Sequence, residues 1–311
     1  MRIVFMGTPE FAIPSLDILR KAGYDIVGVV TAPDRPSGRG QKLRPSAIKS
    51  YAVEHQIPVL QPVKLRDPEF LSALKALQPD LAVVVAFRML PKLVWRIPGI
   101  GTLNLHAALL PDYRGAAPIN WVLINGESQT GVSTFMIDEK IDTGGILLQQ
   151  TVEIPDNWTA GDLHDCLMQE GARLVLKTVE GLETQTIQPV AQDHSQFFHP
   201  APKIYKEDCK INWNRPAGEL YHFIRGLSPY PTAWTHLNGN MFKLFRASRL
   251  LDRVGDASPG QISITNSPVQ FRVACKDYWL SIEEVQLAGK KRMTTVDFLR
   301  GYKGILERLE S

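Results

Sequence analysis

Apolar and polar residues alternate in the first half of the chain in a pattern that predicts strands separated by helices. Apolar runs typical of buried strands lie at residues 3–6, 26–31, 58–60, 81–87 and 101–105. Stretches with helical spacing separate them, at residues 9–19, 47–54 and 68–77. Strands that alternate with helices in this way pair in parallel, and their crossover helices cover both faces of the sheet.

Two further strands and one long helix follow. The strands are predicted at residues 130–136 and 146–152, and an acidic loop at residues 138–145 joins them. The helix is predicted at residues 159–178, where Thr159 is suited to cap its first turn. Residues 1–182 therefore predict an α/β domain with an open, mainly parallel sheet.

The remaining chain has a different pattern. Residues 183–206 lose periodicity and are predicted to be a linker, and residues 207–311 form a second domain. A short helix at 216–226 precedes alternating strands around an Asn238-Gly239 hairpin signal. More strands follow at 261–264, 269–274 and 278–287, and a final helix at 295–302. A β-rich module of this size favours an OB-like barrel, a fold that often binds nucleic acid.

Composition and charge narrow the class of protein. No apolar run approaches the roughly 18 residues of a membrane span, and the first strand begins so early that no signal peptide is expected. The three cysteines are far apart and fit neither a disulfide framework nor a zinc site. We therefore expect a cytoplasmic location. Residues 1–202 carry a net charge of −3 and residues 203–311 one of +6, which suggests a polyanionic partner for the second domain.

Candidate chemistry lies at the end of the strand at residues 101–105. Asn104 and His106 alternate along this strand and its end, so they point to the same side, where an open α/β sheet binds ligands. A carboxylate from the acidic loop, such as Asp142, completes a set with an oxyanion donor, a proton shuttle and an orienting acid. Because the set has no Ser or Cys nucleophile, it suits acyl transfer to an external nucleophile. Taken alone, His106 favours a structural role at a strand end, whereas Asn104, the Pro/Gly-rich loop that follows and the acidic loop together favour catalysis.

These residues also carry a family resemblance. The motifs Asn104-x-His106, Leu109-Leu-Pro111, Tyr113-Arg-Gly115 and Asp138-x-x-x-Asp142-Thr-Gly144 resemble the signature of the 10-formyltetrahydrofolate-dependent formyltransferases. The resemblance implies this family's α/β domain and a C-terminal barrel, and it assigns catalysis to Asn104, His106 and Asp142. In two places the chain departs from the pattern, with Ala108 where Ser is common and Asn212 where Asp is commoner.

The resemblance implies 10-formyltetrahydrofolate as co-substrate, held by two loops and the segment after His106. It assigns folate contacts to Phe87, Arg88, Met89, Leu90, Ala108, Leu109, Leu110, Pro111, Asp138 and Gly144. Within this set, Asp138 is expected to serve mainly as loop scaffolding. No metal is expected, because an unprotonated amine is already a competent nucleophile.

Features outside the signature point to the acceptor. The runs at residues 5–11, 31–46 and 203–213 resemble the branch of the family that formylates methionine on initiator methionyl-tRNA. The long basic loop fits an arm that enters the end of a nucleic-acid helix, through Arg35, Arg39, Lys42 and Arg44. A monomer without membrane contact is expected. Two alternatives remain: transfer to a small amine, either a nucleotide sugar or a purine precursor, and a non-catalytic RNA-binding protein.

Overall fold

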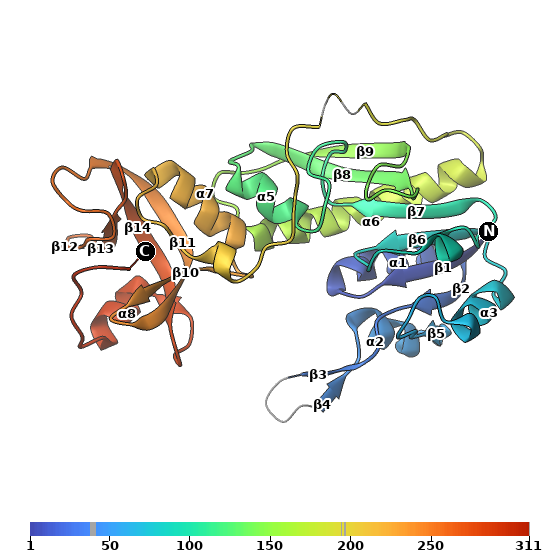
Figure 1. Cartoon of the computed structure of the whole chain (residues 1–311), viewed down its shortest axis with the longest axis horizontal. Coiled ribbons are helices and arrows are strands. Elements are labelled where there is room, and N and C mark those ends of the chain that lie inside the picture. The colour runs from blue at the N-terminus through green and yellow to red at the C-terminus, as the bar shows by residue number, and fades with distance from the viewer. Residues whose placement is uncertain (38–41, 194, 196, 311) are drawn as a thin grey trace. The chain divides into compact units, whose positions relative to one another are not determined.

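The computed structural model describes residues 1–37, 42–193, 195 and 197–310, and of Ser37 and Lys42 only the backbone. The chain divides into two compact units (Figure 1). The first comprises Met1–Gly115, Gln129–Glu153 and His164–Pro200, and the second comprises Ala116–Ser128, Ile154–Leu163 and Ala201–Ser311. The chain therefore passes between the units several times.

The first unit contains a seven-stranded sheet in the order β5-β2-β1-β6-β7-β8-β9. Its strands are β1 (Arg2–Gly7), β2 (Asp25–Val30), β5 (Val59–Leu60), β6 (Leu81–Val85), β7 (Gly101–His106), β8 (Gln129–Met136) and β9 (Ile146–Glu153). The first five pair in parallel, whereas β8 and β9 are antiparallel to their neighbours. A loop as short as the one between β8 and β9 can join only antiparallel neighbours. The predicted mainly parallel sheet is confirmed.

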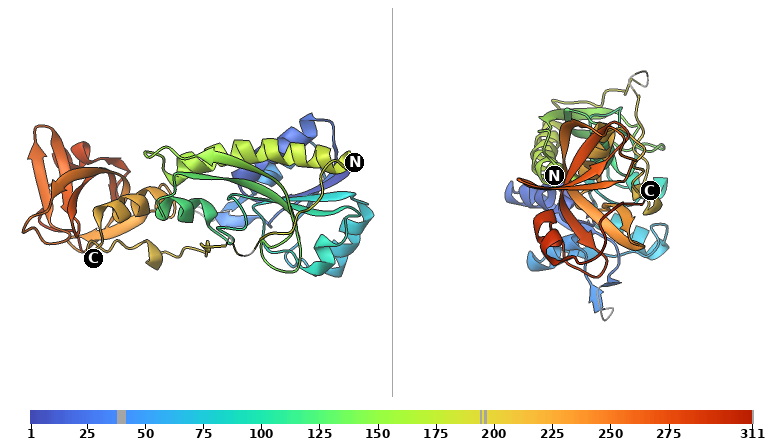
Figure 2. Two further views of the ribbon diagram at one scale, coloured as in Figure 1. Left: turned by 90° about the horizontal axis from the view of Figure 1, so that it is seen from above. Right: turned by 90° about the vertical axis from the view of Figure 1, so that its left-hand side faces the viewer.

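Helices cover both faces of this sheet, as predicted. α3 (Pro68–Ala76) shares an apolar cluster with the face of β6 that carries Val84. Val84 is in register with Asn104 of β7, so Leu105 points to the opposite face. There the long helix α6 (Ala160–Glu183) covers the sheet (Figure 2). A methyl group on Gly171 of this helix would lie 2.6 Å from the Leu105 side chain.

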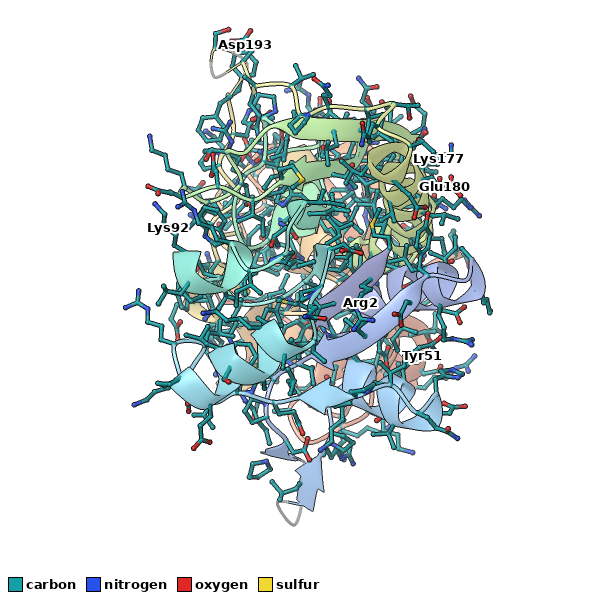
Figure 3. The ribbon with its side chains drawn as sticks, turned by 90° about the vertical axis from the view of Figure 1, so that its right-hand side faces the viewer. Arg2, Tyr51, Lys92, Lys177, Glu180 and Asp193 are labelled. Carbon is teal, nitrogen blue, oxygen red and sulfur yellow. The ribbon has the colours of Figure 1, made fainter. Side chains whose placement is uncertain are left out.

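The long helix α6 begins next to Thr159, as its sequence predicts. The Thr159 hydroxyl accepts a hydrogen bond from Asp162 N at 3.3 Å, and the Asp162 carboxylate accepts one from Thr159 N at 2.8 Å. This reciprocal cap satisfies two backbone donors at the helix start. Lys177 and Glu180 lie on the exposed side of the helix (Figure 3). The other helices of the unit are α1 (Ile13–Lys21), α2 (Ala47–Glu54) and α4 (Lys92–Trp95), with a 3₁₀ turn at Glu10–Ala12.

The basic loop contains regular structure that its sequence does not reveal. β3 (Arg35–Ser37) and β4 (Lys42–Arg44) form a separate antiparallel pair. Strands of three residues are too short for alternation to show. At the base of this pair, Asp34 accepts hydrogen bonds from Lys49 Nζ at 2.6 Å and from Gln61 Nε2 at 2.8 Å. The pair is therefore tied to the body of the first unit.

The second unit is built around an antiparallel sheet in the order β10-β11-β14-β13-β12, with β15 paired to β14. Its elements are α5 (Pro118–Ile124), α7 (Ala217–Leu227), β10 (Ala233–Leu237), β11 (Asn240–Arg253), β12 (Ile262–Asn266), β13 (Val269–Ala274), β14 (Tyr278–Leu287), β15 (Met293–Thr294) and α8 (Thr295–Gly301), with a 3₁₀ turn at Glu207–Cys209. Asn238 and Gly239 have positive φ angles of 50° and 73°, which confirms the predicted hairpin turn.

The C-terminal segment closes this sheet into a barrel. Ile262 N donates to Glu307 O and Leu309 N donates to Gly260 O, each at 2.8 Å, beside the edge strand β12. Glu310 N donates to His236 O at 3.0 Å on the other edge strand, β10. Both edges are thus covered by one segment, which agrees with the predicted OB-like barrel.

Segments from the middle of the chain belong to this second unit because they pack on α7. Asn120 Nδ2 donates to Gly226 O at 2.7 Å, and the buried Arg225 donates to Asp156 O at 3.3 Å. The sequence predicted neither α5 nor these contacts, because α5 is short and its partners are about a hundred residues away.

Candidate active site

His106 ends strand β7 and is held by two groups. Its side chain is buried, and Nε2 lies 2.9 Å from the carbonyl oxygen of Tyr113. Because a carbonyl oxygen only accepts, Nε2 carries the proton in this arrangement. The other ring nitrogen, Nδ1, lies 3.7 Å from Oδ2 of Asp142. The imidazole is therefore oriented by a backbone carbonyl and faces a carboxylate.

Asp142 reaches His106 through an unusual loop. The loop leaves β8 at Ile137, whose N–H donates to Thr102 O near the other end of β7, yet Asp142 lies beside His106. Asp142 has a positive φ of 54°, and its Oδ2 accepts a hydrogen bond from Gly115 N at 3.0 Å. Gly144 is required next to this turn, since a methyl group there would lie 1.7 Å from Met136 O.

The second candidate carboxylate has different surroundings. Asp138 is exposed, and its Oδ1 accepts hydrogen bonds from Lys140 N at 3.0 Å and from Thr143 Oγ1 at 2.8 Å. These contacts stay within the β8–β9 loop. Asp142 is thus the carboxylate of this loop that faces the imidazole, and Asp138 holds the loop's own shape.

Asn104 lies two residues before His106 on β7, in register with Val84 on one side and Phe135 on the other. Asn104 is half-buried, and its side-chain amide makes no hydrogen bond to any residue that the structure describes. Alternation along the strand places it on the face that carries His106. The amide is therefore available as a donor to a ligand.

Two polar side chains hold the segment that follows His106. The buried Ser133 hydroxyl donates to Ala108 O at 2.6 Å and accepts from Leu110 N at 3.0 Å. Gln149 donates to Leu110 O at 2.9 Å. Sequence reasoning identified neither residue, because alternating polar residues in a strand are common. Ala108 itself is fully buried, and the hydroxyl that bonds its backbone comes from the neighbouring strand.

The loop after β6 packs beside the β8–β9 loop. Lys92 at the start of α4 forms an ion pair with Glu139. Arg88 donates to Val63 O at 2.9 Å, and burial lowers its pKa, with a further decrease from the charge of Arg35. In this loop Phe87 is half-buried, Leu90 is buried and Met89 is exposed. The predicted folate-contacting loops are thus brought together, although Arg88 is engaged in holding the backbone at residues 62 and 63.

The basic arm is the loop that carries the β3–β4 pair, within residues 31–46. The charged side chains of Arg35 and Arg44, which the structure describes there, are exposed to solvent. Arg35 and Arg44 are directly opposite each other in the β3–β4 pair, and both are exposed. The backbone of Lys42 lies in β4, whereas Arg39 is outside the described residues. Like charges directly opposite each other repel, so such a pair is suited to contact with an anionic partner.

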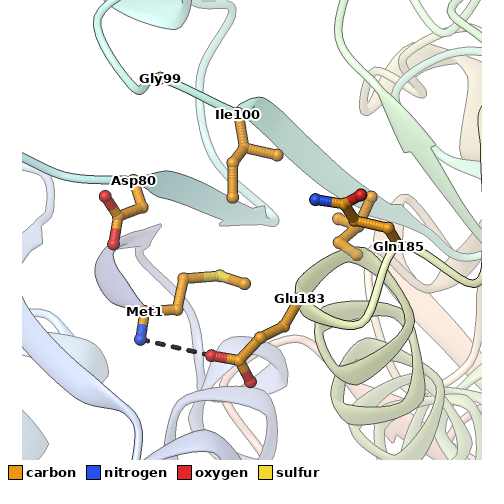
Figure 4. A pocket seen from close by; sticks show the side chains of 7 residues that line it. Met1, Asp80, Gly99, Ile100, Glu183 and Gln185 are labelled. Atoms are coloured by element: carbon orange, nitrogen blue, oxygen red, sulfur yellow. Dashed lines mark hydrogen bonds and ion pairs between the residues drawn. The ribbon is translucent and has the colours of Figure 1, made fainter.

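A pocket of about 440 Å³ lies elsewhere in the first unit (Figure 4). It is at the amino ends of the strands, and its wall includes Asp80 and Ile100. The amino group of Met1, which also lines the pocket, lies 3.4 Å from Oε1 of Glu183. Ligands of open α/β sheets bind at the opposite, carboxyl ends. We assign this pocket no catalytic role. Among the helices of the described residues, none has the length and hydropathy of a bilayer span.

Comparisons with known proteins decide the family. The family described as formyl transferase matches residues 1–179, and its C-terminal domain matches residues 203–303. A methionyl-tRNA formyltransferase of Azobacteroides pseudotrichonymphae is 50% identical over 310 residues, covering 96% of this chain and 95% of the relative. Another, of Parabacteroides distasonis, is 49% identical over 318 residues, covering 99% and 97%. The chain belongs to the methionyl-tRNA formyltransferase family.

Solved structures share the fold of this family at lower identity. The sugar 3N-formyl transferase WlaRD superposes with a TM-score of 0.65 at 20% identity, covering 94% of this chain and 99% of the other. HypX of Aquifex aeolicus superposes with a TM-score of 0.67 at 18% identity, covering 98% and 49%. At this identity they support the fold alone. The predicted family and fold are confirmed.

Proposed function

We propose that the chain transfers the formyl group of 10-formyltetrahydrofolate to the α-amino group of methionine on initiator methionyl-tRNA. The observation that carries the proposal is the buried imidazole of His106, held between the Tyr113 carbonyl and the Asp142 carboxylate, with the amide of Asn104 two residues earlier on the same face of β7. Near-full-length identity of 49–50% with relatives named for this activity supports the acceptor.

In the proposed reaction, the neutral methionine amine attacks the formyl carbon. The new C–N bond forms as the formyl oxygen takes up negative charge, which the Asn104 amide and a protonated His106 Nδ1 stabilise. Asp142 Oδ2 lies 3.7 Å from this nitrogen and so helps to hold the imidazole in place. The attacking amine loses a proton, N10 of the folate gains one, and the bond between N10 and the formyl carbon breaks. Positioning and a preorganised oxyanion site account for the rate, without a covalent enzyme intermediate.

We propose that the folate lies against the two adjoining loops and the segment after His106. The loops are those at residues 86–91 and 137–145, which the Lys92–Glu139 ion pair joins. The segment at residues 108–111 is held in place by Ser133 and Gln149. A site whose walls are fixed before binding loses little entropy when the folate enters. No step of the reaction requires a metal ion.

We propose that tRNA binds through the basic arm and the barrel. Arg35 and Arg44 are exposed on the arm, and Arg39 and Lys42 complete its positive charge. Residues 203–311, with a net charge of +6, contain the barrel. A small amine needs neither feature. We retain the functional division into a catalytic part at 1–182, a connecting part at 183–206 and a tRNA-binding part at 207–311, in a cytoplasmic monomer whose catalytic residues come from one chain.

The choice of Asp142 over Asp138 predicts a ranking of two variants. Asp142→Asn keeps the side chain's shape but removes the charge opposite Nδ1, so we expect kcat to fall by about 10–100-fold. Asp138→Asn is the matched control, and we expect less than about a threefold change. A larger loss of kcat in Asp138→Asn than in Asp142→Asn would show that Asp138, and not Asp142, is the carboxylate that acts in the reaction.

The basic arm predicts a salt-dependent effect on tRNA. Arg44→Ala should weaken tRNA binding and reduce the slope of log K against log salt by roughly 0.7–0.9, because one phosphate contact is lost. Arg39→Ala should raise the KM for charged initiator tRNA while the KM for the folate stays unchanged. Steady-state kinetics at several salt concentrations measure both. Unchanged values for both variants would make the arm a solvated connection and favour a small-amine acceptor.

A further inference from the structure

Gln192 lies in the segment predicted as a linker, yet its side chain is buried. Only 8% of the residue is exposed, and its amide contacts three other residues. Nε2 donates to Asp142 O at 3.0 Å and to Gly144 O at 2.8 Å. Oε1 accepts from Arg114 Nε at 3.2 Å and also from its Nη2. Both donors and the acceptor of the amide are therefore used.

The backbone near Gln192 is hydrogen-bonded to the end of the same β8–β9 loop. Val190 and Ile146 exchange two backbone hydrogen bonds of 2.8 Å each. Pro189 packs on Gly145 so closely that a methyl group there would lie 2.7 Å from the Pro189 side chain. The position of Gln192 is thus set by an antiparallel bridge at the start of β9, and not by its side chain alone.

The two carbonyls that Gln192 bonds are on either side of a strained turn. Asp142 has a left-handed φ of 54°, a conformation that residues other than glycine rarely adopt. The amide of Gln192 bridges the carbonyls of Asp142 and Gly144 and so stabilises this turn. This turn places the Asp142 carboxylate opposite His106 Nδ1.

The acceptor side of Gln192 orients a cation near the same carboxylate. Burial lowers the pKa of Arg114, and the charges of Asp142 and Asp138 oppose that decrease. Arg114 also lies over the ring of Phe197, with 5.4 Å between the guanidinium and the ring centre. Because the Gln192 oxygen is uncharged, it orients the guanidinium without neutralising it. A glutamate at the same position would neutralise Arg114 and repel Asp142.

We propose that Gln192 is a positioning residue for formyl transfer, which holds the Asp142 turn through its N–H groups and Arg114 through its oxygen. The proposal rests on the proposed function. It assigns a role to a residue that contacts neither the imidazole nor, in our account, the substrates. Its effect must therefore appear in turnover more than in the binding of either substrate.

Two substitutions distinguish the donor bonds of Gln192, to Asp142 O and Gly144 O, from its acceptor bond with Arg114. Gln192→Met keeps the length of the side chain and removes every hydrogen bond. Gln192→Glu is isosteric and keeps an acceptor for Arg114, but it replaces the donors to Asp142 O and Gly144 O with a repulsive oxygen. Gln188→Met, at an exposed position of the same segment, is the matched control. Each protein is assayed for kcat, for both KM values and for its melting temperature.

We expect both Gln192 variants to lose about 10–100-fold in kcat, because small displacements of a catalytic group have effects of this size. Both KM values should stay within about threefold of the wild type, and Gln188→Met should match the wild type. Wild-type kcat in both Gln192 variants would overturn the proposal, and so would wild-type kcat in Gln192→Glu alone. If Gln192→Met melts more than about 5 °C lower, the isosteric Gln192→Glu decides. A wild-type protein unable to formylate methionyl-tRNA would instead refute the proposed function.

Discussion

His106→Ala should lower the turnover of formyl transfer by about 10²–10⁴-fold while the KM for 10-formyltetrahydrofolate changes little. The imidazole is a strand-end side chain that a backbone carbonyl and a carboxylate hold in one orientation. Its proposed contribution is made mostly in the transition state, where the formyl oxygen is charged. Loss of such an interaction lowers kcat and kcat/KM together.

A second histidine–carboxylate pair in the chain provides the control. His164 Nδ1 lies 2.9 Å from Asp165 Oδ1 on helix α6, and both side chains are partly exposed. His164→Ala removes an imidazole of the same kind at another position and should leave kcat within about twofold of the wild type. Near-wild-type turnover in His106→Ala, with the protein folded, would remove His106 from the reaction.

Asn104→Ala should lower kcat by about 10²–10³-fold, the usual effect of removing one oxyanion donor. Its amide has no partner among the described residues, so the loss of the side chain leaves no buried group unsatisfied. The melting temperature should therefore hardly change. Kinetic analysis together with thermal unfolding separates this result from a folding defect.

Asn104→Asp is the informative companion to the alanine variant. It keeps the shape of the side chain but replaces the donor with a negatively charged acceptor beside the developing oxyanion. We expect it to be at least as inactive as Asn104→Ala. If Asn104→Asp kept more than about a tenth of wild-type kcat, the amide would not be acting as an oxyanion donor.

Except for the short strands β3, β4 and β15, the strands and the position of two catalytic candidates followed from the sequence because both depend on local pattern. β6 is apolar at all five positions and buried throughout, and β13 and β14 have the predicted bounds. Asn104 and His106 were found because the end of a parallel strand is where ligands bind. The role of Asp142 depended on the resemblance, since its loop starts at the far end of β7 and no spacing rule brings it back.

The parts that sequence reasoning missed depend on contacts between distant residues. Ser133 and Gln149 bond the backbone of the segment after His106, and Gln192 bonds the Asp142 turn. Each is a polar residue whose function is set by a partner 23 to 50 residues away. Residues 183–206 were expected to be a linker because they lack periodicity, but a segment can be irregular and still be fixed by hydrogen bonds.

The most direct test of the central claim is an acceptor assay with the purified protein and 10-formyltetrahydrofolate. Tetrahydrofolate release is measured with initiator methionyl-tRNA, elongator methionyl-tRNA, an amino sugar nucleotide and an amine of purine synthesis. We predict release with initiator methionyl-tRNA, together with an N-formylmethionyl product, and a kcat/KM for it far above that of any other acceptor. Release with a small amine and not with methionyl-tRNA would contradict the account, as would tRNA binding without any release.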